Sequence, residues 1–170
     1  MTPNFHTADL WDDHGPLCQS CDLQFQQFGA RSAFFGSIRT VKCYDDNVLV
    51  RQVLETPSKG EIMVVDAAGF LGAAIVGDQI AALAIRNGWA GIVIFGVLRD
   101  SVALRGMDIG IKALGTNPKK SGKKGVGEQG VPVSFGNVIF HPGEWIYSDP
   151  DGILVSTENL LREGRSRADK

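Results

Sequence analysis

Three charged side chains have the types and spacing of a small-molecule site. Asp78 follows the apolar segment 73–76, and Arg99 and Asp100 directly follow the run IVIFGVL, seven residues without a polar side chain. A planar guanidinium can grip a carboxylate through two parallel hydrogen bonds, and a carboxylate oxygen is a ligand that Mg²⁺ prefers. These residues therefore indicate a site for an acidic small molecule.

Each of the three residues also has a purely structural explanation. Asp100 can neutralise its neighbour Arg99 in a simple salt bridge, and Asp78 can cap the helix that follows it. Charged residues after strands are common in loops. Residue type and spacing leave both explanations open.

The elements that would position this site alternate between strands and helices. Strands are expected at 31–44, 61–69, 69–78, 91–97 and 109–115, and helices at 45–55, 77–89 and 101–106. Asp45 or Asp46 is expected to cap the first of these helices, and Gly88 to end the second in a left-handed conformation. The alternation predicts an α/β fold with parallel strands.

This order of elements predicts where the charged residues lie. Open α/β sheets place their ligand crevice at the carboxyl ends of the strands, where Arg99 and Asp100 stand. The helix that begins at Gly77 and Asp78 crosses back, so its start faces the same edge. The unpaired amides of Gln79 and Ile80 would then form an anion site with Gly77, strengthened by the helix dipole.

The chain changes character after Gly115. TNPKKSGKKGVGEQG is a basic, glycine-rich segment whose lysines (Lys119, Lys120, Lys123 and Lys124) predict a solvated, mobile loop, with attraction of an anion as the alternative. GVGEQG matches GxGxxG, but it precedes the strand-like VPVSF rather than a helix, so we reject a dinucleotide site. Short strands are expected from Val131 on, followed by a fraying helix over 157–170.

Composition restricts the classes of function. A length of 170 residues with 44% hydrophobic and 21% charged residues fits one globular domain over 1–170. A net charge of -2 gives no reason to expect nucleic acid. The chain has neither an apolar run of bilayer length nor a signal-peptide pattern at its start, so we expect a cytoplasmic protein without a membrane role.

The cysteines and histidines give little indication of a metal site. Cys18 and Cys21 form a CxxC pair, but no second pair supplies the four ligands of a structural zinc site, so we expect free thiols. The histidines (His6, His14 and His141) are scattered and are expected to be ordinary residues.

Longer stretches carry a family resemblance. VVDAAGFLGAAIVGDQIAALAIRNGWAGIVIFGVLRDS, DIGIKALGTNP and EWIYSDPDGILVS resemble the regulator of ribonuclease E activity A (RraA) family and the related 4-hydroxy-4-methyl-2-oxoglutarate aldolases. The resemblance runs from about Thr7 to Ser156, and TADLWDD resembles the family's N-terminal helix. Asp78 followed after twenty residues by Arg99 and Asp100 matches the most specific signature of the aldolases.

The resemblance implies a fold, an assembly and an activity. The fold would be a swivelling-domain type β/β/α domain, assembled as a homotrimer or a dimer of trimers. The residues Gly77, Asp78, Gln79 and Ile80 would contact a pyruvate-like substrate, Arg99 would bind it, and Asp100 would hold Mg²⁺ or Mn²⁺. The activity would be aldol cleavage of 4-hydroxy-4-methyl-2-oxoglutarate-type substrates with oxaloacetate decarboxylation, and Asp78 would orient a catalytic water.

The sequence departs from the family's pattern in two places. Ala67 and Ala68 stand where the family is usually glycine-rich, which should narrow the crevice if this loop approaches the substrate. The chain also has no obvious counterpart of the acidic residue that the larger aldolases take from a neighbouring subunit's C-terminal region.

The sequence also bears on two other functional classes. A non-catalytic regulator that binds and inhibits ribonuclease E is the competing interpretation, and Asp100 argues against it because a pure binder does not need a metal-binding carboxylate beside Arg99. A methyltransferase has no support, because no glycine-rich cofactor loop lies between a strand and a helix.

Overall fold

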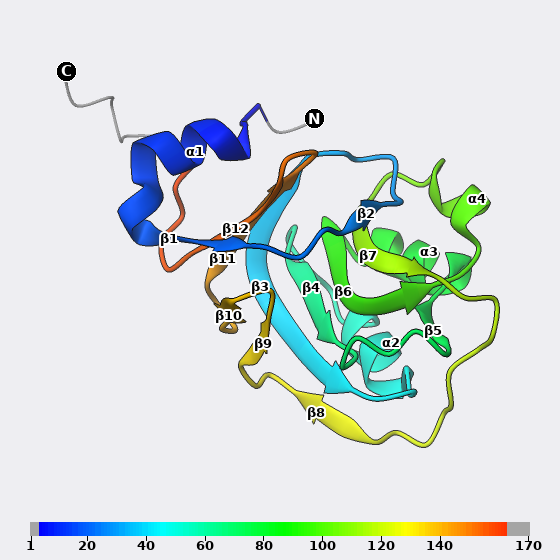
Figure 1. Cartoon of the computed structure of the whole chain (residues 1–170). Helices are drawn as coiled ribbons and strands as arrows, with labels where there is room; N and C mark the ends of the chain where they lie inside the picture. Colours follow the sequence, from blue (N-terminus) through cyan, green and yellow to red (C-terminus); the bar gives the residue numbers. More distant parts are fainter. Residues whose placement is uncertain (1–3, 163–170) are drawn as a thin grey trace.

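The central element of the molecule is a long, strongly twisted β-sheet (Figure 1). This computed structural model describes residues 4–162. Its strands are β1 (Cys18–Cys21), β2 (Gln26–Gln27), β3 (Phe34–Cys43), β4 (Ile62–Asp66), β5 (Ala74–Val76), β6 (Gly91–Leu98), β7 (Gly110–Thr116), β8 (Gly127–Gln129), β9 (Val133–Phe135), β10 (Val138–Phe140), β11 (Trp145–Asp149) and β12 (Gly152–Ser156). Its helices are α1 (Thr7–His14), the 3₁₀ turn η1 (Gly15–Leu17), α2 (Val48–Leu54), α3 (Asp78–Arg86) and α4 (Ser101–Leu104).

The sheet has an antiparallel part and a parallel part that share β3. Its order is β1-β12-β11-β3-β4-β6-β7-β2, with β5 beside β6, β8 beside β3, and β9 and β10 in a separate pair. The first residues of β3 pair antiparallel with β11, and Ile38–Lys42 pair parallel with β4. Gly36 lies at this transition, and a Cβ there would approach the Gly60 carbonyl oxygen to 2.2 Å. A side chain at position 36 would therefore clash with the backbone close to the point where β3 changes its partner.

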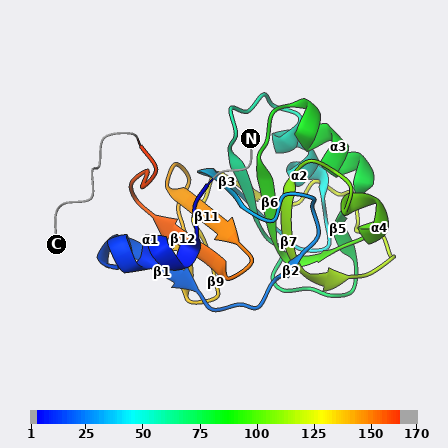
Figure 2. The same ribbon diagram turned by 90° about the horizontal axis from the view of Figure 1, so that it is seen from above.

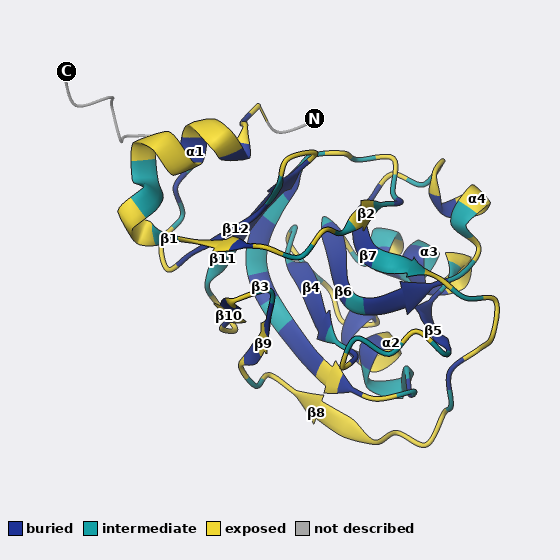
Figure 3. Ribbon diagram, viewed as in Figure 1, coloured by how far each residue is buried: buried dark blue, intermediate teal, exposed yellow. Residues whose placement is uncertain are grey.

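Helices α2, α3 and α4 lie together on one side of the parallel part, while α1 lies beside β1 and β12 (Figure 2). Each of the three helices connects successive parallel strands, which confirms the predicted α/β class and its β/β/α arrangement. The main core lies between these helices and the sheet, where Val50, Val53, Leu54, Ile80 and Ala84 are buried. β4 and β6 have no clear alternation because apolar clusters cover both of their faces (Figure 3).

Most predicted elements are confirmed, and one is wrong in its described part. Gly88 has φ +84 and ends α3 as expected. Residues 157–162 form bends and turns instead of a helix, while 163–170 lie outside the described residues. Leu160 is buried there, and its amide donates to the Tyr147 hydroxyl at 2.7 Å, so a tertiary contact replaces the first helical turn.

No helix among residues 4–162 has the length and apolar character needed to cross a bilayer.

Candidate active site

Strand pairing brings Gly77 and Arg99 together. β5 runs parallel to β6, with Val76 opposite Leu98, so both strands end at the same edge of the sheet. The Arg99 amide donates to the Val76 carbonyl oxygen at 2.9 Å. The predicted juxtaposition of the start of α3 with Arg99 and Asp100 is therefore present.

Helix α3 begins with amides that have no helical partner. Gly77 is its N-cap, with extended backbone angles, and Asp78 is its first residue. The structural role considered for Asp78 as N-cap is therefore wrong by one position. The amides of Gln79 and Ile80 have no acceptor among the described residues, so they remain available to an anion, as predicted.

The Asp100 carboxylate lies against this helix start. Its Oδ2 accepts a hydrogen bond from the Asp78 amide at 3.2 Å and lies 3.7 Å from Arg99 Nε. The second distance exceeds a direct hydrogen bond, so Arg99 is not fully paired with its neighbour. Both side chains are about one-third exposed, at 34% and 36%, and can reach a ligand.

The backbone at this point is unusual and crowded. Asp100 has φ 58 and ψ 35, a left-handed conformation that Asp tolerates better than most residues. A Cβ on Gly77 would lie 2.5 Å from Asp100 Oδ2, although φ at Gly77 is -135, which any residue can adopt. Glycine at position 77 therefore leaves room for the Asp100 carboxylate in its observed place.

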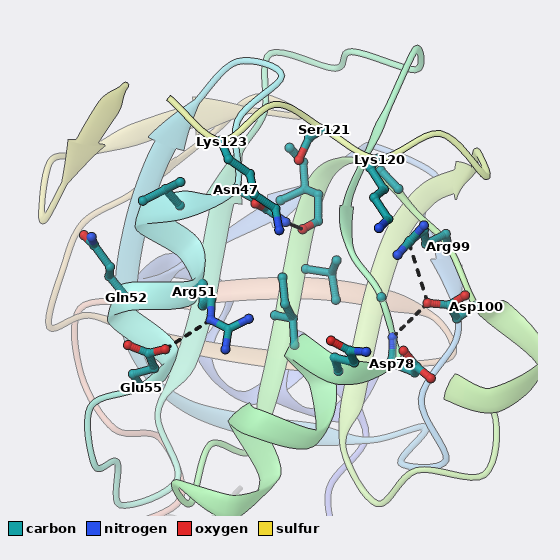
Figure 4. Close-up of a pocket in the computed structure, with 17 residues that line it drawn as sticks. Asn47, Arg51, Gln52, Glu55, Asp78, Arg99, Asp100, Lys120, Ser121 and Lys123 are labelled. Carbon is teal, nitrogen blue, oxygen red and sulfur yellow. Dashed lines mark hydrogen bonds and ion pairs between the residues drawn. The ribbon is translucent and has the colours of Figure 1, made fainter. Parts of the chain in front are cut away.

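These residues line a cavity of about 390 Å³ (Figure 4). Arg99, Asp100 and Asp78 lie on one side of it, and Arg51 and Glu55 lie on the opposite side. Its charged side chains are four cations and three acids: Arg51, Arg99, Lys120, Lys123, Glu55, Asp78 and Asp100. The predicted residues Gly77, Gln79 and Ile80 line it as well.

The far wall of this cavity was not predicted. It comes from α2 and its two flanking residues, which supply Asn47, Val48, Arg51, Gln52 and Glu55, and from the segment 119–124, which supplies Ser121 and Lys123. Lys120 of the same segment lies beside Arg99 (Figure 4). In the sequence, the run of lysines was the one indication that segment 119–124 could contribute to the site, because attraction of an anion was the alternative to a solvated loop. Nothing in the local sequence indicated that α2 faces the start of α3.

The segment 119–124, called the strap below, is fixed by its backbone rather than free. The Ala74 amide donates to Lys119 O at 2.8 Å, and the Ser121 amide donates to Ala74 O at 3.3 Å. Its lysine side chains are exposed, as predicted, but Ser121 is only 7% exposed. The sequence predicted a mobile loop, whereas hydrogen bonds to Ala74 tie the backbone of the strap to the neighbouring strand.

Asp46 anchors the end of the strap. Its Oδ2 accepts hydrogen bonds from the amides of Lys124 at 2.6 Å, Gly125 at 2.8 Å and Val126 at 3.4 Å. Its Oδ1 accepts from the amide of Val48, the first residue of α2, at 3.0 Å, but the N-cap of α2 is Asn47, so the predicted capping by Asp45 or Asp46 is wrong by one position. Burial raises the pKa of Asp46, but these amides outweigh it and hold the pKa below its ordinary value.

Ala67 and Ala68 do not narrow the crevice. Neither residue lines the cavity around Arg99, and Ala68 instead lines a neighbouring depression with Tyr44 and Phe95. The condition of the expectation, that this loop approaches the site, is therefore not met. Ala68 has a left-handed φ of 56.

The carboxylate oxygens in the cavity suit a hard cation, such as Mg²⁺, that needs few ligands from the protein. Asp100 Oδ1 has no partner among the described residues, and the Asp78 carboxylate lies on the same side of the cavity. Residues 4–162 contain no cluster of three or more His, Cys, Asp or Glu side chains. Mg²⁺ keeps several waters and needs only one or two carboxylates, so this donor set fits Mg²⁺ better than a structural zinc.

The CxxC pair is unrelated to this site. Cys18 and Cys21 are free, and both lie on β1, where residues three apart point to opposite faces. Burial raises the pKa of both thiols.

Solved structures include proteins that are similar to this chain in both sequence and fold. A structure described as S-adenosylmethionine: 2-dimethylmenaquinone methyltransferase from Geobacillus kaustophilus HTA426 is 43% identical, with a TM-score of 0.92, and the match covers 94% of this chain and 100% of that one. The RNA-processing inhibitor RraA from Thermus thermophilis is 39% identical, with a TM-score of 0.89 and coverage of 94% and 98%.

A more distant relative has the same fold. Streptomyces coelicolor RraAS2, described as an unusual member of the RNase ES inhibitor RraA protein family, is 28% identical, with a TM-score of 0.68 and coverage of 88% and 77%. The RraA-like (Aldolase/RraA) family matches residues 7–155. The chain belongs to the RraA-like family.

Proposed function

We propose that this protein is a divalent-metal-dependent pyruvate aldolase that also decarboxylates oxaloacetate. The observation that carries the proposal is the grouping of Arg99, Asp100 and the free amides at the start of α3 around one cavity. The family includes aldolase and decarboxylase members as well as inhibitors of ribonuclease E, so membership alone does not choose between them.

The residues divide the work of binding a 2-oxo acid. Arg99 would bind the substrate carboxylate or 2-oxo oxygen, and the amides of Gln79 and Ile80 would donate to the other oxygens. Asp100 would hold Mg²⁺ or Mn²⁺, and the bound cation would supply Lewis-acid stabilisation of negative charge. Asp78 is exposed at the helix start, where it can orient a water for proton transfer.

Both proposed reactions form the same enolate. In aldol cleavage, the C4 hydroxyl loses its proton, the C3–C4 bond breaks, and the electron pair of that bond forms the pyruvate enolate. In oxaloacetate decarboxylation, the same bond breaks and CO₂ leaves. Arg99 and the helix amides stabilise the enolate oxygens, and a proton delivered to C3 through the water at Asp78 completes pyruvate.

One assay tests this proposal directly. Purified protein should release pyruvate from oxaloacetate with added Mg²⁺ or Mn²⁺, and an excess of chelator should abolish the release above the metal-only background. Asp100→Ala should lose the metal dependence. If the folded protein shows no metal-dependent turnover of oxaloacetate or of 4-hydroxy-4-methyl-2-oxoglutarate, the proposed enzymatic function is refuted.

The second candidate is a protein regulator of ribonuclease E, favoured by the 39% identity to the Thermus inhibitor. Inhibition of ribonuclease E cleavage by both wild type and Asp100→Ala would support this function, because protein contact does not need the metal site. Both proposals include assembly as a homotrimer or a dimer of trimers. Light scattering, which gives the molar mass in solution, checks this assembly.

We do not propose a methyltransferase. The GxGxxG segment, Gly125 to Gly130, includes β8, which pairs with β3, and β9 follows it. This segment therefore lacks the helix N-terminus on which a dinucleotide-type loop depends.

A further inference from the structure

The strap side of the cavity contains a polar group that has no protein partner. Ser121 lines the cavity and is 7% exposed, yet its Oγ has no hydrogen-bond partner among the described residues. A buried hydroxyl left unpaired costs about 1–3 kcal/mol, so such groups normally have a partner. A ligand in the cavity would supply one.

Two cations with unused hydrogen-bond donors line the same cavity as this hydroxyl. Lys123 lines the cavity two residues along the strap and has no ion-pair partner among the described residues. Arg51 faces the cavity from α2, and only its Nε is engaged, with Glu55 Oε1 at 3.1 Å. Its two terminal nitrogens have no acceptor in the described chain.

The charge of the whole cavity also favours an anion with more than one negative group. Its four cationic and three acidic side chains leave one positive charge in excess. A divalent cation at Asp100 would raise the excess to three. Pyruvate brings a single carboxylate and fills little of a cavity of about 390 Å³.

The geometry of the strap allows a defined position for a second anionic group. Bonds to Ala74 hold the strap at one end, and Asp46 holds it at the other. Ser121 and Lys123 therefore belong to a fixed wall, opposite the start of α3 that bears Asp78 (Figure 4). A rigid support of this kind is what a binding subsite requires.

We propose that Ser121, Lys123 and Arg51 form a second anion subsite for the distal carboxylate of a 2-oxo diacid, while Arg99 and α3 bind its 2-oxo acid end. The inference rests on the proposed function and deepens it, because it assigns the residues that would bind the distal carboxylate of the diacid substrates and select them over monoacids. Lys119 is a matched control on the same strap, since it is exposed and does not line the cavity.

Kinetics with paired substrates test the subsite. 4-Hydroxy-4-methyl-2-oxoglutarate carries the distal carboxylate, and 4-hydroxy-4-methyl-2-oxopentanoate carries a methyl group in its place. Lys123→Met and Arg51→Met should each lower the ratio of the two kcat/KM values about tenfold to a hundredfold, the range of charge-assisted hydrogen bonds. Ser121→Ala should lower it about threefold to tenfold. Lys119→Met should leave the ratio at the wild-type value.

A binding measurement separates this proposal from the activity. Calorimetry with 2-oxoglutarate and 2-oxopentanoate should show tighter binding of the diacid by wild type, and Lys123→Met should remove that preference. If wild type turns over neither aldol but keeps this preference, the aldolase proposal fails and the subsite stands. Equal binding of the two acids by wild type, or equal effects of Lys119→Met and Lys123→Met, overturns the subsite.

Discussion

Two Arg–Asp pairs in this molecule differ in how completely the partners bind each other. Arg31 and Asp108 form a bidentate pair, with Nε to Oδ1 at 2.7 Å and the second bond at 3.0 Å. Arg99 Nε and Asp100 Oδ2 are 3.7 Å apart, and that oxygen also accepts the Asp78 amide. The first pair satisfies itself, whereas the second leaves a guanidinium and a carboxylate oxygen available to a ligand.

The pKa directions of Arg31 and Asp108 reflect their direct hydrogen bonds. The hydrogen bonds from Arg31 hold the pKa of Asp108 below its ordinary value, and the same bonds raise the pKa of Arg31. The same two residue types therefore form a closed surface pair at one place and leave polar groups open to a ligand at the other, according to what else the backbone places beside them.

Removing each arginine should separate the two pairs most strongly. We expect Arg99→Ala to lower kcat/KM for oxaloacetate about a thousandfold, because a charge-stabilising donor at the reacting oxygens is lost. Arg31→Ala should keep the wild-type rate, since Arg31 does not line the cavity. Steady-state kinetics of both variants check this, and equal losses would show that the open pair has no special role.

Closing the space beside Asp100 should have the next largest effect. Gly77→Ala places a methyl group 2.5 Å from Asp100 Oδ2, so the carboxylate must move. A misplacement of about 1 Å can cost about a hundredfold in rate, and we expect a loss of that order in kcat/KM.

Gly115→Ala is the control, because its Cβ would meet only Gln26 Nε2 at 3.7 Å. A Gly77→Ala enzyme as active as Gly115→Ala would contradict the tight fit of Asp100.

The anchor of the strap should affect stability. Asp46→Asn should lower the free energy of unfolding by about 2 kcal/mol, because an amide group would face backbone donors in place of a carboxylate oxygen. The folded pKa of Asp46 is lowered, so its stabilisation is present above the unfolded value of about 3.9 and is lost as pH falls through the folded value. Urea titrations from pH 7 to pH 3 should show the difference between variant and wild type shrinking as pH falls, and a constant difference would contradict the assignment.

Ala68 should give the smallest effect. It holds φ 56, a conformation in which glycine avoids a cost of about 1 kcal/mol. Ala68→Gly should therefore raise the midpoint of thermal unfolding slightly and leave the kinetics unchanged, since Ala68 does not line the cavity. A lowered midpoint would indicate that chain entropy outweighs the strain.

The near wall of the site could be predicted from the sequence because it depends on local patterns. An unbroken apolar run gave β6, an amphipathic pattern ending in Gly88 gave α3, and the rule that parallel strands end at one edge joined them. The far wall depends on contacts that no local pattern encodes. Asp46 reaches Lys124 across 78 positions, and this contact turns a lysine-rich loop into a fixed wall.

Tertiary contacts also explain the error at the C-terminal end. Leu160 and Leu161 fit a helical pattern, but the Tyr147 hydroxyl accepts the Leu160 amide, and the Leu160 side chain packs with Phe5 and Leu154. Helix propensity is weak compared with such burial.

Exchange of the pyruvate methyl protons with D₂O tests the central claim most directly, because it requires the enolate but no second substrate. With Mg²⁺, wild type should exchange these protons well above the metal-only rate, as followed by proton NMR. Asp100→Asn, which keeps a side chain suited to the left-handed backbone, should fall to the metal-only rate, whereas Arg31→Ala should exchange like wild type. Wild-type exchange no faster than metal alone, or exchange unchanged in folded Asp100→Asn, would contradict the account.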